Sequence, residues 1–123
     1  MNLNTKQESL RIALLTYSTK PRGGVVHTLE LAEHLQKMGH QVHIFALGKD
    51  EQGFFRSTSF PFTLIPCKMG DKDESLYTRI ERFIDTYFQF LIRHSQNTFD
   101  IYHAQDCVSA NALWKASEKG LCS

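Results

Sequence analysis

The chain has 123 residues, of which 41% are hydrophobic and 22% are charged, as is usual for one globular domain. Its formal net charge of +1 creates no strong field, so neither a nucleic acid nor an anionic membrane is expected as a partner. The sequence contains neither a signal-peptide pattern nor an apolar run long enough for a transmembrane segment, which favours a cytoplasmic protein.

The cysteines and histidines do not form a metal-ligand pattern. Cys67, Cys107 and Cys122 are far apart and lack Cys-x-x-Cys spacing, which is typical of ordinary thiols in a reducing compartment. The histidines do not cluster at metal-ligand spacing either. We therefore expect no metal and no cofactor.

Residues 1–10 are polar and are expected to form a disordered tail, followed by one domain over residues 11–123. Residues 12–17 are nearly all apolar, which is typical of a central strand of a parallel sheet. A polar turn at 18–24 follows, in which Pro21 prevents continued strand pairing. Gly23 and Gly24 in this turn permit φ angles that other residues avoid.

An amphipathic helix is expected from Val25 to Met38, because apolar residues recur there at steps of three and four. Gly39 should end it in the left-handed conformation. The second strand at 42–47 then pairs in parallel with the first, as a long helical connection requires. Backbone N–H groups at the glycine turn can face an anion, with the helix dipole behind them.

The rest of the chain continues the alternation of strands and helices. In order, we expect a loop at 48–59 with Phe54 and Phe55 folded back onto the body, a strand at 62–66, a charged loop at 68–74, a helix at 75–95, a strand at 99–104 and a helix at 108–118 that stops at Gly120. The aromatic stripe of the long helix is assigned to the core.

These elements predict an α/β fold, a Rossmann-like parallel sheet with helices on both faces. The strand order should be 3-2-1-4 if the crossovers are right-handed and the chain changes direction after the third strand. This order brings the Gly23–Gly24 turn beside residues 103–106, where open α/β sheets bind ligands.

Two segments together resemble a known family. The stretch PRGGVVHTLELAEHLQKMGHQVHIFA, followed by an aliphatic strand and then FDIYHAQD, resembles the amino-terminal domain of the family 4 glycosyltransferases, retaining enzymes of the GT-B fold. The resemblance covers residues 10 to 120. It implies a nucleotide-sugar donor, with Gly23 and Gly24 on the side of its diphosphate. It also implies that this domain forms much of the pocket for a carbohydrate, lipid or small-molecule acceptor.

Five further residues are expected to position the substrate: Arg22, His27, His103, Gln105 and Asp106. The resemblance points to the last three, whereas Arg22 is chosen for its charge beside the glycines and His27 for its position near the strand ends. Lys20 could add charge near the glycines, but Lys20 and Arg22 fit equally well as solvated loop cations. Gln105 stands where the family pattern carries a second histidine. Glutamine does not titrate near neutrality, which argues against an acid or base role there.

The resemblance also implies that the catalytic centre is incomplete. Family members close their active site against a second Rossmann-like domain, which holds most of the nucleotide and an E-x7-E pair of glutamates. They also carry a histidine in a Thr-x-His context on a fifth strand, and the sequence stops at Ser123 before such a strand. We therefore expect a partial amino-terminal domain that is inactive alone and has an unpaired edge on its fourth strand.

Two alternatives remain open. The chain could be a non-catalytic fragment, or a partner subunit that docks on a separate carboxyl-terminal half through the unpaired edge. It could also be a stand-alone dinucleotide-binding module. The turn lacks the G-x-G-x-x-G pattern, and Asp50 lies beyond the tip of the second strand, both of which disfavour that module.

Overall fold

Four parallel strands form one sheet in the computed structural model, which describes residues 8–48, 53–67, 70, 72–94 and 98–120. The elements are β1 (Arg11–Thr16), α1 (Gly23–Lys37), β2 (Gln41–Gly48), β3 (Phe62–Pro66), α2 (Leu76–His94), β4 (Ile101–Ala104) and α3 (Cys107–Glu118). The strand order is β3-β2-β1-β4. The predicted α/β, Rossmann-like fold and its strand order are confirmed.

β1 is the most buried strand: it lies between β2 and β4, and every residue after Arg11 is buried. Leu15 lies opposite Phe45 of β2 and Ala104 of β4. Residues along a strand point alternately to opposite faces, so β1 contributes to two separate cores. Its apolar residues are all buried, which explains the continuous apolar run in the sequence.

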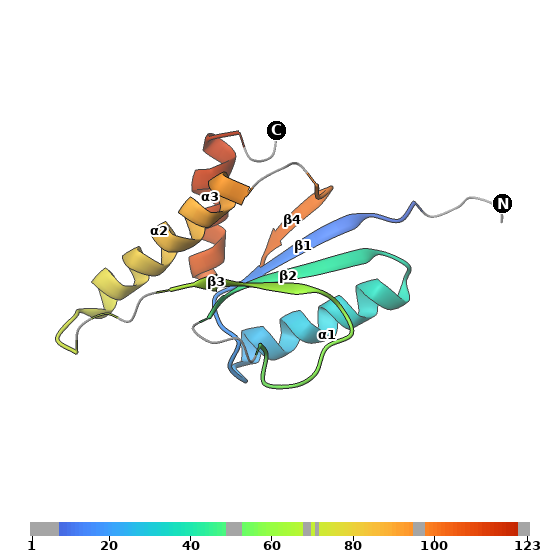
Figure 1. Ribbon diagram of the computed structural model, residues 1–123, viewed down its shortest axis with the longest axis horizontal. Helices are drawn as coiled ribbons and strands as arrows, with labels where there is room; N and C mark the ends of the chain where they lie inside the picture. Colours follow the sequence, from blue (N-terminus) through green and yellow to red (C-terminus); the bar gives the residue numbers. More distant parts are fainter. Residues whose placement is uncertain (1–7, 49–52, 68–69, 71, 95–97, 121–123) are drawn as a thin grey trace.

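One face of the sheet is covered by α1 (Figure 1). The buried side of this helix consists of Val25, Thr28, Leu29 and Ala32. These pack with the residues of β1 and β2 that point the same way, among them Leu14 and Ile44. The apolar spacing that predicted the helix therefore corresponds to its contact with the sheet.

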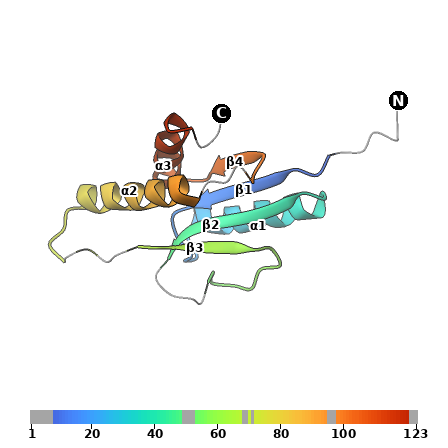
Figure 2. The same ribbon diagram turned by 45° about the horizontal axis from the view of Figure 1, so that its top comes forward.

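The opposite face is covered by α2 and α3, which lie next to each other (Figure 2). The stripe from α2 that enters this core includes Ile84, Tyr87 and Leu91. Helix α3 adds Ala112 and Ala116. The assignment of the aromatic stripe to packing is confirmed for residues 80–91, whereas Leu76 and Ile92 near the helix ends are exposed.

Two elements begin two residues away from their predicted starts, and the other boundaries agree to within one residue. Helix α1 begins at Gly23, because Arg22 is extended (φ −98°, ψ 155°) and its carbonyl already accepts the N–H of Val26 at 2.9 Å. The glycines thus occupy the first helical turn and do not lie in the preceding loop. β4 begins at Ile101, two residues later than expected.

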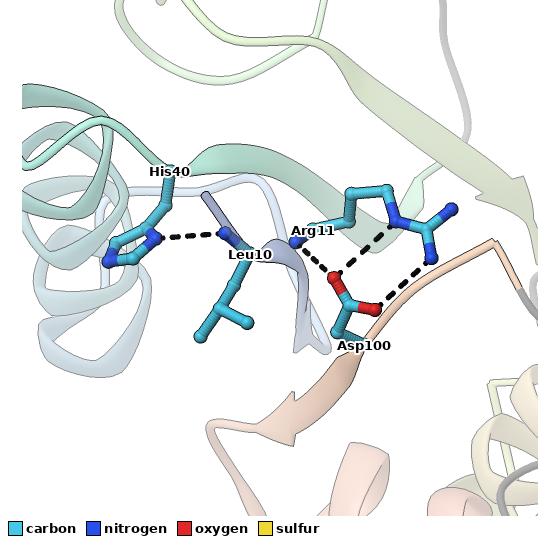
Figure 3. A network of polar contacts seen from close by, with 4 residues as sticks. All are labelled: Leu10, Arg11, His40 and Asp100. Carbon is cyan, nitrogen blue, oxygen red and sulfur yellow. Dashed lines mark hydrogen bonds and ion pairs between the residues drawn. The ribbon is translucent and has the colours of Figure 1, made fainter. Parts of the chain in front are cut away.

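Side-chain hydrogen bonds join neighbouring strands at the amino-terminal end of the sheet (Figure 3). The carboxylate of Asp100 accepts the backbone N–H of Arg11 at 2.8 Å and its guanidinium at 3.1 Å. The ring Nδ1 of His40 accepts the backbone N–H of Leu10 at 3.1 Å. Arg11 lowers the pKa of Asp100 through these hydrogen bonds. These contacts occupy the end of the sheet opposite the one where ligands are expected.

Candidate functional site

The carboxyl ends of β1 and β4 lie side by side, and each leads toward the start of a helix (Figure 1). β1 is followed by residues 17–22 and then α1, whereas β4 passes through only Gln105 and Asp106 before α3. Helix α1 lies on one face of the sheet and α3 on the other. The order in which strands are added to the sheet therefore reverses between β1 and β4. Open α/β sheets form ligand crevices at such a point.

The amino terminus of α1 carries no side-chain cap. Arg22 is the N-cap residue, and no side chain caps this helix start in the described part of the chain. Its first turn contains no acidic residue, and Gly23 and Gly24 are exposed. The backbone N–H groups of this turn and the positive end of the helix dipole therefore face solvent.

The fold does not require glycine at either position. Among the described glycines, positive φ angles occur only at Gly39, Gly53 and Gly120. A Cβ atom added to Gly23 or Gly24 would meet nothing within 4 Å. Alanine favours a helix more than glycine does, so the conformation of this turn does not account for either glycine.

The start of α3, by contrast, is capped by a side chain. Asp106 is its N-cap, and Oδ1 of its carboxylate accepts the backbone N–H of Ser109 at 2.8 Å. Oδ2 accepts the N–H of Tyr17 at 2.8 Å and the hydroxyl of Thr16 at 3.1 Å. Both carboxylate oxygens of Asp106 are thus engaged by groups of the protein, and its substrate-positioning role stays a prediction.

His103 and Gln105 form a hydrogen-bonded pair at the end of β4. Their side chains approach to 2.6 Å between Nε2 of Gln105 and Nδ1 of His103. The backbone N–H of Gln105 donates to the carbonyl of Leu15 at 2.8 Å, which fixes the glutamine against β1. When Gln105 donates, Nδ1 of His103 is the acceptor and the ring N–H is on Nε2. The Nε2–H group of His103, which is exposed at the end of β4, is then available as a hydrogen-bond donor.

The chain matches the family described as Glycosyltransferase Family 4 over residues 21–121. It belongs to this family. The matched segment contains Arg22, both glycines of α1 and the whole of β4 and α3. The predicted resemblance to an amino-terminal family 4 glycosyltransferase domain is therefore confirmed. No curated protein matches the chain.

Three further candidate residues of this family 4 domain are exposed. Lys20 and Arg22 lie on the loop before α1, where the N–H of Arg22 donates to the carbonyl of Lys20 at 2.7 Å. His27 lies on the exposed side of α1, one turn after Gly23. The structure thus places all three near the uncapped helix start, and their contact with a ligand stays a prediction.

Sequence reasoning missed the polar contribution of Tyr87. This side chain of α2 is fully buried, and its hydroxyl donates to the carbonyl oxygen of Phe45 at 2.8 Å. Burial raises the pKa of Tyr87 well above its ordinary value, and the charge of Asp106 raises it further. The only indication of this hydrogen bond in the sequence is that Tyr87 places a hydroxyl within the apolar stripe of α2.

Two other classes of site were sought. Among the described residues, no group of three histidine, cysteine, aspartate or glutamate side chains is placed to hold a metal ion. None of the described helices is long and apolar enough to cross a membrane. Asp50, considered in the dinucleotide alternative, lies outside the described residues, as does Cys122.

Proposed function

We propose that this family 4 domain forms the acceptor side of a glycosyltransferase active site and contacts the diphosphate of a nucleotide-sugar donor. The diphosphate lies at the start of α1, where the backbone N–H groups of Gly23 and Gly24 donate to its oxygens. The supporting features are the uncapped helix start and its position at the carboxyl ends of β1 and β4.

One observation carries this proposal more than any other. Gly23 and Gly24 lie in a helical turn that has open space around both positions and no positive φ. Glycine costs a helix about 0.5–1 kcal/mol relative to alanine. A diphosphate that touches the backbone accounts for this cost, because a Cβ atom would hold its oxygens away from the N–H groups.

The acceptor lies on the β4 side of the same edge. His103 and Gln105 supply hydrogen bonds to its hydroxyl groups, and their mutual contact fixes the orientation of the imidazole. Arg22 and His27 are exposed beside the helix start and complete the polar rim. Gln105 does not titrate, so it orients the acceptor and does not exchange a proton with it.

A second Rossmann-like domain, on the same polypeptide or on another, supplies the remaining contacts. By resemblance to the family, that domain holds the nucleotide and the pair of glutamates. The two domains together would form a GT-B enzyme that needs no metal ion. Residues 1–123 alone are therefore expected to bind a diphosphate weakly and to transfer no sugar.

The proposal is tested by adding inorganic pyrophosphate, and then UDP, to the isotope-labelled chain while its amide NMR signals are recorded. We expect the largest shifts at Gly23, Gly24 and Val25, and several-fold weaker binding by Gly24→Ala. Asn111→Ala serves as the control, because Asn111 is exposed on α3 and bonds only to Cys107 in the described residues.

Two results would contradict the proposal. One is a set of shifts at millimolar pyrophosphate that leaves the start of α1 unaffected. The other is tighter binding of NAD than of either pyrophosphate or UDP, which would favour the stand-alone dinucleotide module. The Gly24→Ala variant is informative in both cases, since the added methyl group meets open space and should not disturb the fold.

A further inference from the structure

We propose that Asp106 is a positioning residue, whose carboxylate holds the end of β1 against the start of α3 and thereby fixes the path of residues 17–22 into α1. This inference rests on the proposed function, because the segment that Asp106 fixes ends at the glycines of the diphosphate site. In this inference Asp106 affects the ligand by holding the backbone in place, and it does not contact the substrate itself.

The contacts of Asp106 join two elements that are distant in the sequence. Its Oδ2 atom accepts from Thr16 and Tyr17, which precede it by 90 and 89 residues. Its Oδ1 atom accepts from Ser109 in the first turn of α3. The hydroxyl of Ser109 donates in turn to the carbonyl of Leu15 at 3.0 Å. The last residues of β1 are thus bonded to the α3 start from two directions.

The hydrogen bond from the N–H of Tyr17 to Asp106 takes the place of a backbone hydrogen bond between strands. The pairing of β1 with β2 ends at Thr16, so the N–H of Tyr17 lies just beyond the ladder. A backbone N–H in a half-buried position needs an acceptor, and Asp106 supplies a charged one. Without it, β1 would fray at the end that leads to the glycine turn.

The segment after Tyr17 is short and has few other attachments to the body. The carbonyl of Thr19 accepts the N–H of Phe55 at 3.2 Å. Its other hydrogen bonds within the described residues are local: the N–H of Lys20 donates to the hydroxyl of Ser18, and the N–H of Arg22 donates to the carbonyl of Lys20. A change in the position of Tyr17 is therefore transmitted along residues 18–22 to Gly23.

Thr16 makes the two possible roles of Asp106 separable. Its side chain is only 1% exposed, so no ligand can reach its hydroxyl. Any effect of Thr16 on ligand binding must act through Asp106 and the backbone. If Asp106 instead acts only by touching substrate, replacement of Thr16 leaves both the segment and its ligand affinity unchanged.

The experiment compares four variants of the whole chain by amide hydrogen exchange and by pyrophosphate titration. Asp106→Ser keeps a good helix cap but is too short to reach Thr16 and Tyr17. Thr16→Val removes one donor while preserving shape, and Thr16→Ser restores it. Asn111→Ala is the matched control, because it alters the first turns of α3 without touching β1.

We expect Asp106→Ser and Thr16→Val to raise amide exchange over residues 17–24 and to weaken pyrophosphate binding by at least about threefold. Thr16→Ser and Asn111→Ala should match the parent chain in both measurements. Parent-like exchange over residues 17–24 in both Asp106→Ser and Thr16→Val would overturn the inference.

The two proposals fail in different ways. If the parent chain does not bind pyrophosphate, the proposed function fails, and the exchange rates still decide whether Asp106 fixes the segment. If Asp106→Ser weakens binding while Thr16→Val does not and exchange is unchanged in both, the loss of affinity does not pass through residues 17–24. That result would refute the positioning role.

Discussion

The hydroxyl of Tyr87 on α2 donates a hydrogen bond of 2.8 Å to the backbone carbonyl oxygen of Phe45 on β2. Tyr87 is the largest of the fully buried side chains in the described residues. This contact adds a directional bond to the apolar packing of α2 on the sheet.

Tyr87→Phe should therefore lower the free energy of unfolding by about 1 kcal/mol, since the ring still fills its space while the hydrogen bond is lost. Urea denaturation measures this change. Tyr77→Phe is the control and should have almost no effect, because Tyr77 is 74% exposed. Equal stability of Tyr87→Phe and the parent chain would show that the bond contributes nothing net.

The raised pKa of Tyr87 also predicts how stability changes in alkali. The folded chain holds this phenolic proton more tightly than the unfolded chain, whose tyrosines ionise near pH 10. The resulting stability is complete below about pH 10 and is lost as the pH rises above it. Tyr87→Phe should remove this part of the alkaline loss, which denaturation at a series of pH values would detect.

Gly23→Ala and Gly24→Ala should each raise the free energy of unfolding, by roughly 0.5 kcal/mol, while they weaken diphosphate binding. Both effects come from the same methyl group, which restricts the unfolded chain and blocks approach to the backbone. Urea denaturation and the pyrophosphate titration measure them on the same samples. A loss of stability in either variant would mean that the turn needs glycine for the fold.

The contrasting control for this prediction is Gly39→Ala. Gly39 has a φ of +96° and ends α1, and an added Cβ would meet nothing within 4 Å. Any cost there comes from the backbone conformation alone. We expect a loss of about 1 kcal/mol, opposite in sign to the change at Gly24.

The sequence was sufficient for those parts of the fold that depend on local pattern. The apolar run of β1, the spacing along α1 and α2, and the left-handed Gly39 and Gly120 all have the predicted roles. The strand order followed because right-handed crossovers leave few alternatives. Each of these features is decided within one element or by a general rule of chain connection.

The site could be predicted only as a set of residues on neighbouring strand ends. Two partners of Asp106, Thr16 and Tyr17, lie about 90 residues away in the sequence, and the partner of Tyr87 lies 42 residues away. No local pattern encodes such pairs. Phe55 shows the same limit, because it was expected to fold back beside Phe54 but is 43% exposed, while Phe54 is buried.

At the amino-terminal end of the sheet, the lowered pKa of Asp100 predicts a loss of stability in acid (Figure 3). Arg11 favours the charged carboxylate, so this stability is present above the ordinary pKa of about 3.9 and is lost as the pH falls toward the lower folded value. Both side chains are exposed, so the effect is small and weakens in salt. Thermal midpoints of Asp100→Asn at low and high salt test this, with the exposed Glu30→Gln as control.

The lowered pKa of His43 predicts a second loss of stability, nearer to neutral pH. Burial disfavours the charged imidazole, whose ring lies 4.7 Å from that of Phe45 and bonds to the hydroxyl of Thr63 at 2.7 Å.

The unfolded chain therefore binds the proton of His43 more readily than the folded chain does. Stability is complete above about pH 6.5 and declines as the pH falls below it, until the folded imidazole is also protonated. His43→Gln should flatten this part of the stability curve, whereas His34→Gln, at an exposed position of α1, should not. Parallel curves for His43→Gln and the parent chain between pH 7 and pH 5 would show that another group causes the decline.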